Sequence, residues 1–101
     1  MKLKKTDVLI LKCVRSDMTS DGNDGRPPFV WPASGHVEAP DWNPAAVCGG
    51  GLHGWLWGAG DPSTCSFLND EGNKWLVLRC PADSVVDLDG KVKVPSCDVV
   101  F

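Results

Sequence analysis

The chain has 101 residues, of which 43% are hydrophobic and 23% are charged, and its formal net charge is −3. This length suits one domain with one core, and this composition excludes an intrinsically disordered chain. The apolar run near the N-terminus is interrupted by Asp7 and Lys12, which argues against a secretory signal, and no stretch reaches the roughly 18 apolar residues of a membrane span. We predict a single cytoplasmic domain over residues 1–101, without membrane contact.

The charges are unevenly distributed along the chain. Residues 1–15 carry five basic residues and one acidic residue, whereas residues 16–73 carry one basic and eight acidic residues. An acidic surface repels nucleic acid and favours a basic partner. We therefore expect no direct binding of nucleic acid and a protein partner with a basic surface.

The first predicted elements are a strand and a long loop. Residues 7–15 place apolar side chains on both alternating faces, which is typical of a central strand covered on two sides. Residues 16–47 are rich in Gly, Pro, Ser and Asp and are predicted to be mostly loop, with short apolar inserts as anchors. A loop of about 30 residues is unusual in a small domain and is often functional. Its candidate binding residues are Asp21, Asp24, Asp41 and Trp42.

The glycine-rich stretch CGGGLHGWLWG, residues 48–58, follows this loop. A helix is excluded here, because each of its five glycines would cost about 1 kcal/mol relative to alanine. A strand beginning near Leu52 places His53, Trp55 and Trp57 on one face, and Gly54 on the other face would admit a neighbouring chain.

Four interpretations of this row stay open. Trp55 and Trp57 can fill the core, with His53 bonded to the backbone, or they can anchor a partner, since tryptophan is enriched at binding hot spots. A metal site at Cys48 and His53 would need remote ligands, because no standard zinc spacing is present among the five cysteines. A catalytic Cys48–His53 pair could use backbone N–H groups of the glycines to bind an oxyanion. Adjacency in sequence does not bring the two reactive atoms together.

The C-terminal third supplies the remaining elements. Residues 62–68 and 81–85 begin like helices of at most two turns, and residues 74–80 form the second predicted central strand. The final CDVVF, residues 97–101, is predicted to be a paired strand, with Phe101 buried.

A hairpin is predicted around Asp89-Gly90 in SVVDLDGKVKVP, residues 84–95. A two-residue turn would put Lys91 and Lys93 on the same face as Val86 and Leu88, which mixes core with solvent. We therefore prefer a three-residue turn through Leu88, Asp89 and Gly90. That register pairs Val86 with Val92 and Asp87 with Lys91. The expected fold class is α+β, predominantly β, a compact domain with a mixed or antiparallel sheet, a C-terminal hairpin and one or two short helices.

The glycine-rich motif also carries a resemblance to a family. Its residues are Cys48, Gly51, Leu52, His53 and Gly54, with Trp31, Pro40, Asp41 and Trp42 before them and Lys91 and Lys93 after them. In these residues the chain resembles an uncharacterised domain family of phage and bacterial genomes with a Cys-Gly-x-Gly-Leu-His-Gly signature. The resemblance implies a phage or mobile-element setting and no established activity. The central histidine keeps a ligand or catalytic role for His53 open.

These observations favour a binding protein over an enzyme. We predict a small accessory protein that binds a protein partner, such as an anti-CRISPR-type inhibitor of a host nucleic-acid-binding complex, without cofactor or metal. Its candidate binding residues are His53, Trp55, Trp57, Trp42, Asp41, Asp21 and Asp24. The alternative is a small enzyme that uses the Gly-Leu-His-Gly segment with His53 and Cys48. Its glycine-rich strand and terminal hairpin are similar to those of ADP-ribosyltransferase-type domains, but the chain has only two glutamates.

Overall fold

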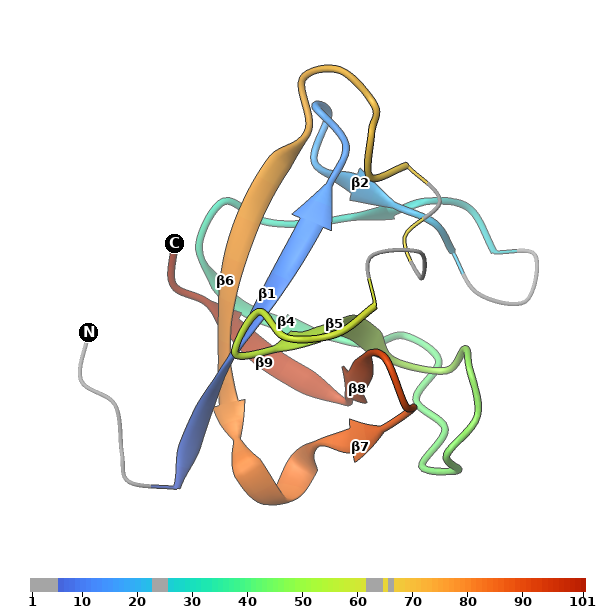
Figure 1. Ribbon diagram of the computed structural model, residues 1–101, viewed down its shortest axis with the longest axis vertical. Helices are drawn as coiled ribbons and strands as arrows, with labels where there is room; N and C mark the ends of the chain where they lie inside the picture. Colours follow the sequence, from blue (N-terminus) through green and yellow to red (C-terminus); the bar gives the residue numbers. More distant parts are fainter. Residues whose placement is uncertain (1–5, 23–25, 62–64, 66) are drawn as a thin grey trace.

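A seven-stranded antiparallel sheet organises the chain (Figure 1). The computed structural model describes residues 6–22, 26–61, 65 and 67–101. The sheet has the strand order β4-β9-β6-β1-β5-β8-β7, and its strands are β1 Asp7–Val14, β4 Gly35–Glu38, β5 Leu52–Leu56, β6 Lys74–Pro81, β7 Val86–Asp87, β8 Val92–Val94 and β9 Ser96–Val99. A second, two-stranded sheet pairs β2 Thr19–Ser20 with β3 Phe29–Val30. The predicted, predominantly β fold class is confirmed.

The centre of the sheet is the pair β1 and β6. They are antiparallel over eight residues, from Asp7 opposite Pro81 to Val14 opposite Lys74. β5 lies on the other side of β1, with Leu11 opposite Trp55. Both predicted central strands are therefore confirmed, and β5 begins at Leu52 as expected.

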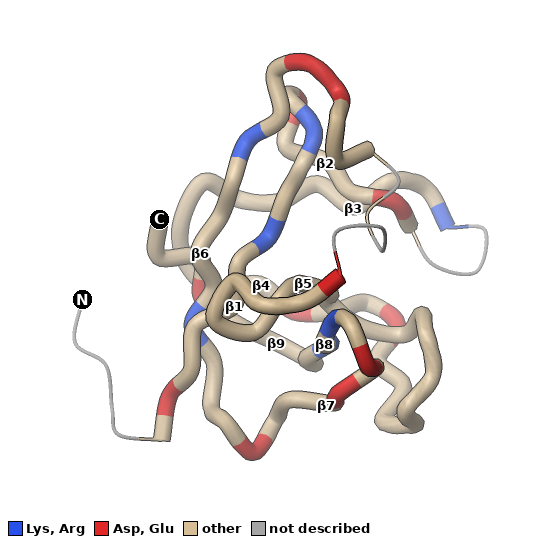
Figure 2. The backbone as a smooth tube through the Cα atoms, in the orientation of Figure 1, with Lys and Arg blue, Asp and Glu red and all other residues tan. Residues whose placement is uncertain are grey.

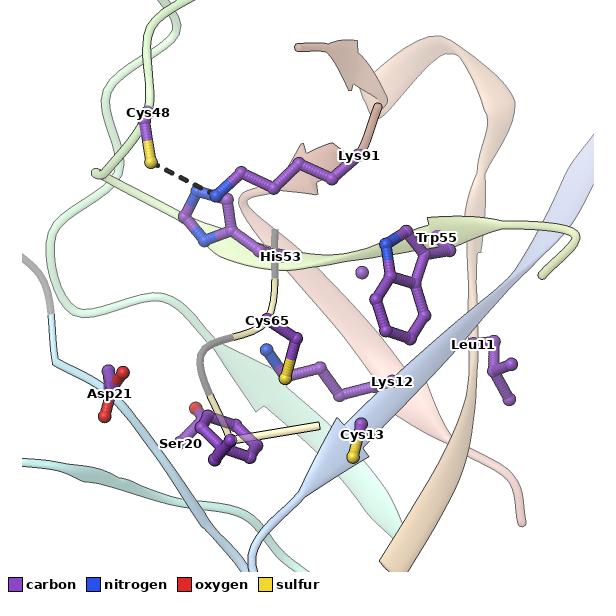
Figure 3. Close-up of a pocket in the computed structure, with 12 residues that line it drawn as sticks. Leu11, Lys12, Cys13, Ser20, Asp21, Cys48, His53, Trp55, Cys65 and Lys91 are labelled. Carbon is purple, nitrogen blue, oxygen red and sulfur yellow. Dashed lines mark hydrogen bonds between the residues drawn. The ribbon is translucent and has the colours of Figure 1, made fainter. Parts of the chain in front are cut away.

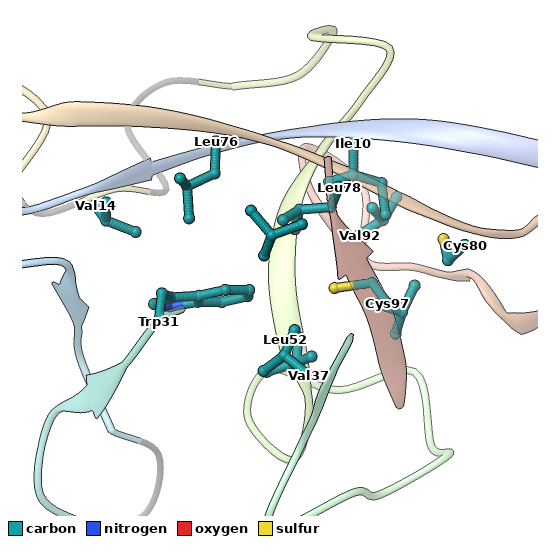
Figure 4. Close-up of a cluster of buried hydrophobic side chains, with 12 residues drawn as sticks. Ile10, Val14, Trp31, Val37, Leu52, Leu76, Leu78, Cys80, Val92 and Cys97 are labelled. Carbon is teal, nitrogen blue, oxygen red and sulfur yellow. The ribbon is translucent and has the colours of Figure 1, made fainter. Parts of the chain in front are cut away.

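The main core lies on one face of this sheet (Figure 4). Its buried residues are Ile10, Val14, Trp31, Val37, Leu52, Leu76, Leu78, Cys80, Val92, Val94, Cys97 and Val99. Trp31 anchors the long loop here, because its ring is buried and its Nε1–H donates to Ser20 Oγ at 2.9 Å. A smaller buried cluster of Cys13, Trp55 and Phe67 forms separately. Cys13 belongs to the opposite face, since side chains alternate along β1.

The predicted loop 16–47 contains three short strands that the sequence pattern did not indicate. Two of them, β2 and β3, form the small sheet. The third, β4, pairs with β9 at the sheet edge, with Val37 opposite Cys97. Val37 is the one apolar residue of β4 and it is buried. A strand held mainly by pairing with a distant segment leaves little trace in local composition.

The register predicted for the hairpin is wrong. Val86 lies opposite Lys93 and Asp87 lies opposite Val92. Asp89 (φ 58°) and Gly90 (φ 116°) form a two-residue turn, closed by the Leu88 N–H, which donates to the Lys91 carbonyl at 2.9 Å. Positive φ at both central residues is the geometry that matches strand twist in such hairpins. The error came from assigning lysines to solvent, whereas Lys93 is fully buried.

The end of the chain is paired, as predicted, but the prediction that Phe101 is buried is wrong. β9 pairs with both β4 and β6, and beyond it the Val77 N–H donates to the Phe101 carbonyl at 3.0 Å. The Phe101 side chain is nevertheless 81% exposed. Backbone pairing at a sheet end therefore does not bring this side chain over the core.

The predicted helices are short or undescribed. Residues 81–85 contain one 3-10 turn, η2 Ala82–Ser84. Of the predicted helix 62–68, residues 62–64 and 66 lie outside the described residues, and residues 67–69 form a turn.

Candidate functional site

The glycine-rich stretch places β5 against β1 at very short range. A Cβ atom on Gly54 would overlap the Cγ2 methyl of Ile10 and would lie 2.8 Å from the Leu11 carbonyl oxygen. The absence of a side chain at Gly54 therefore allows this close approach, which confirms the expectation for this glycine. Gly54 thereby fixes the position of its neighbours, His53 and Trp55.

The expected row of His53, Trp55 and Trp57 is divided between three environments. Trp55 is 8% exposed and packs in the smaller core cluster, with its ring centroid 6.0 Å from that of Trp75. Trp57 follows the last residue of β5 and is 59% exposed. His53 is partly buried, and its Nε2 atom is buried without a hydrogen-bond partner. The core interpretation thus fits Trp55, while Trp57 is available to a partner.

His53 lines a cavity of about 240 Å³ between β1, β5 and the residues Cys65 and Phe67 (Figure 3). The cavity combines cationic, thiol and aromatic side chains. Its lining residues are Leu11, Lys12, Cys13, Ser20, Asp21, Cys48, His53, Gly54, Trp55, Cys65, Phe67 and Lys91. A second cavity of about 280 Å³ shares Lys12, Ser20, Asp21 and His53 with the first.

Burial and positive charge set the protonation of this cavity. Burial, followed by the charges of Lys91 and Lys12, lowers the pKa of His53 to about 4. Burial is also the largest effect on Lys12 and lowers its pKa to about 8, with Lys91 acting in the same direction. His53 is therefore neutral at pH 7, and Lys12 remains mostly protonated. The Lys12 ammonium lies 5.6 Å from the centroid of the Trp31 ring.

Cys48 and His53 line the same cavity, but the contact that the structure shows for Cys48 is with Lys91. The Lys91 ammonium donates to Cys48 Sγ at 3.1 Å, and Cys48 is exposed (Figure 3). The two residues of the catalytic pair considered above therefore line one cavity, but the Cys48 thiol is hydrogen-bonded to Lys91. Among residues 6–22, 26–61, 65 and 67–101, no three His, Cys, Asp or Glu side chains are placed to hold a metal ion.

Sequence reasoning missed Lys12 as a residue of this cavity. The available signal was its position, since Lys12 is a charged residue inside the otherwise apolar run of β1. A charged residue there needs either a partner or a polar cavity.

Comparison with known proteins now identifies the family. A model of the domain of unknown function DUF7666 matches residues 8–101. The chain belongs to the DUF7666 family. This DUF7666 domain is also similar to ice nucleation proteins of Pseudomonas syringae and of Pseudomonas syringae pv. syringae, with 38% identity over 75 residues. These alignments cover 71% of this chain and only 6% of each relative. No solved structure matches the chain.

The acidic candidate residues of the DUF7666 domain have different surroundings. Asp21 lines both cavities and forms an ion pair with Arg15. The Asp41 side chain is 8% exposed and has Oδ2 at 4.0 Å from Arg26 Nε, so little of it faces solvent. Asp24 lies outside the described residues. Of the two described carboxylates, Asp21 is exposed and Asp41 is mostly buried, so these two do not form one exposed patch.

Trp42 is partly buried in the DUF7666 domain, and the Lys93 ammonium lies 5.5 Å from the centroid of its ring. This cation–π contact gives Trp42 a role in packing the loop.

None of the helices in the described part of the chain is long and apolar enough to cross a membrane.

The partly buried His53 should make the stability of the fold sensitive to acid. Because the pKa of His53 falls to about 4 in the folded state, from an ordinary value of about 6.5, the unfolded state binds its proton more readily. The contribution to stability is complete above about pH 6.5 and is lost as the pH falls toward 4. We expect a loss of about 1–2 kcal/mol in the free energy of unfolding, a value reduced because the ring is only partly buried. Urea unfolding of the wild type and of His53→Gln at pH 7 and 4.5 measures this loss of stability.

The exposed histidine provides a control with the opposite sign. Hydrogen bonds to Asp98 and then Glu38 raise the pKa of His36, so its contribution is present below about pH 6.5 and is lost as the pH rises through its raised pKa. His53→Gln should flatten the loss of stability on acidification, and His36→Gln should steepen it. The same pH dependence in wild type and His53→Gln would contradict the assignment.

Proposed function

We propose that this DUF7666 domain binds a protein partner through its two exposed tryptophans, Trp57 and Trp75. The observation that carries the proposal is the environment of Trp57, which is 59% exposed and has a φ of 52°. A left-handed backbone is costly for a bulky residue, and glycine or asparagine would adopt it more easily. Neither burial nor backbone conformation favours tryptophan at this position, which supports a role in binding.

A groove connects the region of Trp57 with Trp75. It is lined by Leu11, Trp55, Gly58, Gly60, Leu68, Asn69 and Trp75. Trp75 is 47% exposed and packs against the buried Trp55, so its indole is held in place at the wall of the groove. Gly58 also lines the groove and directly follows Trp57 in the chain. Anchored aromatic residues beside a groove are typical of binding hot spots.

The border of this groove is acidic. Asp61 follows the groove residue Gly60, and Asp70 and Glu71 follow the groove residue Asn69; all three acids are exposed. Figure 2 shows the acidic turn at the top of the view, where the chain approaches β6. Lys74 is a basic residue adjoining Trp75. With a net charge of −3 for the whole chain, this border supports a partner with a basic rim around an apolar centre.

The size of the domain relative to its relatives also supports a binding module. The chain corresponds to 6% of the length of the ice nucleation proteins that it matches, so domains of this kind occur within much longer chains. Inhibition of a host nucleic-acid-binding complex is the narrower form of this proposal, because such complexes present basic surfaces. An enzyme that uses His53 and Cys48 remains the second candidate, supported by their shared cavity.

Substitution of Trp57 should separate binding from folding. Trp57→Asn suits the left-handed backbone and should leave the melting temperature unchanged or slightly higher. It should weaken binding to a purified partner by roughly 30-fold or more, as expected for a hot-spot tryptophan worth about 2 kcal/mol. The partner is first captured from host lysate and then purified, and its affinity is measured by calorimetry at low and high salt. Higher salt should weaken binding, because the groove border is acidic.

Val30→Ala is the matched control, since Val30 is exposed but lies on β3, away from the groove. A specific partner is retained by this variant and lost by Trp57→Asn and by Trp75→Ala. Equal binding by all variants would overturn the proposal. Self-association through the groove would instead appear as a dimer in sedimentation of the wild type that Trp57→Asn abolishes, and that result would also overturn it.

A further inference from the structure

We propose that the cavity of Figure 3 binds a small phosphate monoester, with Lys12 and Lys91 holding the phosphate group. This cavity shares Leu11 and Trp55 with the tryptophan groove, but the proposal does not rest on protein binding. The cavity of about 240 Å³ is smaller than the roughly 300–1,000 Å³ of typical clefts for drug-sized ligands, so its ligand is small.

The cavity has an excess of positive charge. Lys12 extends from β1 and Lys91 reaches over from the turn before β8 (Figure 3). The hydrogen bond shown for the Lys91 ammonium goes to the Cys48 thiol, which is a weak acceptor. Asp21 is the carboxylate among the lining residues, and its Oδ1 is already bonded to Arg15. An anion in the cavity would therefore neutralise two ammonium groups that repel one another.

His53, which lines the same cavity, has an unsatisfied polar atom. Its Nε2 is buried and has no hydrogen-bond partner in the described structure. Buried polar atoms in folded proteins are normally paired, and an unpaired one needs an explanation. Because His53 lines the cavity, a ligand whose binding turns this nitrogen toward the cavity would supply a partner for it. The His53 ring is neutral at pH 7, so His53 serves as a hydrogen-bonding group beside the two charged lysines.

The remaining walls favour an organic ligand with a flat apolar part. Leu11, Trp55 and Phe67 line the cavity, and Trp55 is held by its packing against Trp75. Aromatic walls stack on planar groups. A phosphate monoester carries close to two negative charges at pH 7, since its second pKa is about 6. Two ammonium groups therefore match it better than they match a carboxylate, which has one charge.

The probe for this site is phenyl phosphate, which joins a dianionic head to a planar ring. Titration at pH 7, followed by two-dimensional NMR, should give saturable shifts at Lys12, His53 and the Trp55 indole. Phenyl sulfate has the same shape but only one negative charge. Its affinity should be lower than that of phenyl phosphate by roughly tenfold or more. Inorganic phosphate alone should compete at higher concentration, because it lacks the ring.

Charge-removing variants test the assignment of residues. Lys12→Met and Lys91→Met should each weaken phenyl phosphate binding by roughly tenfold or more, as expected for loss of a charged hydrogen bond. Lys74→Met removes the same charge from an exposed residue that lines neither cavity and should leave the affinity unchanged. Thermal melting monitors the fold of each variant. Lys91 is in a turn and only partly buried, so Lys91→Met carries the test even if Lys12→Met does not fold.

The absence of saturable binding to the wild type would overturn the proposal. An equal loss of affinity in Lys74→Met would also overturn it, because binding would then reflect the general charge of the surface. Trp57→Asn should bind phenyl phosphate like the wild type, since Trp57 does not line the cavity. The outcomes for the cavity and for the tryptophan groove are therefore distinguishable.

Discussion

Replacement of Gly54 by alanine is expected to destabilise the fold by about 3 kcal/mol, the upper end of typical overpacking costs. The added methyl group would overlap the Cγ2 methyl of Ile10 and lie 2.8 Å from the Leu11 carbonyl oxygen. Both neighbours belong to β1 in the centre of the sheet, so neither can move without disturbing its pairing with β6. Urea unfolding followed by tryptophan fluorescence measures the loss.

A second substitution separates the two clashes at Gly54. Ile10→Leu removes the Cγ2 methyl, so Gly54→Ala should cost less in the Ile10→Leu background than in the wild type. Recovery should be partial, because the backbone oxygen of Leu11 stays in place. A loss below about 0.5 kcal/mol in Gly54→Ala alone would show that β5 shifts freely away from β1, contrary to this structure.

Lys93→Ala is expected to cost roughly 3 kcal/mol, although lysine is usually a surface residue. The Lys93 side chain is fully buried, and its ammonium donates to the carbonyl oxygens of Val47 at 2.9 Å and Gly49 at 3.0 Å. Alanine would leave a cavity, remove both hydrogen bonds and end the contact with the Trp42 ring. Denaturant unfolding gives the change in stability.

Two further variants show which part of Lys93 matters. Lys93→Met keeps most of the packing volume and should cost about 1–2 kcal/mol, the loss from the two carbonyl hydrogen bonds. Lys91→Ala removes the same charge two residues away and should cost less than about 1 kcal/mol, because Lys91 is only partly buried. A result for Lys93→Ala as small as that for Lys91→Ala would mean that the buried ammonium contributes no net stability.

The central strands were predictable because their signal is local. Apolar residues on both faces of β1 and β6 indicate strands that are covered on two sides, and the glycines before Leu52 exclude a helix. The hairpin register was not predictable from the same reasoning, since it assumed that Lys93 must face water. Its two acceptors, at positions 47 and 49, lie more than 40 residues away in the chain.

The candidate site was predicted only in part. His53 and Cys48 line one cavity and Trp57 is exposed, while their binding roles stay predictions. Strand periodicity alone placed Trp55 and Trp57 in the same row, but β5 ends at Leu56 and Trp57 adopts a left-handed backbone. The cavity itself was not predictable, because it is assembled from distant segments of the chain that local patterns cannot place together.

The contacts of Lys91 and Lys93 also define how this part of the molecule moves. One short stretch of the hairpin holds three consecutive residues where the long loop meets the glycine-rich stretch. Lys93 donates to the carbonyl oxygens of Val47 and Gly49, and Lys91 donates to the thiol of Cys48 between them. Residues 47–49 are therefore held in place by the β7–β8 hairpin, although they have no regular secondary structure. The two should open and close as one cooperative unit, so that the wall of the cavity is only as rigid as the hairpin that holds it.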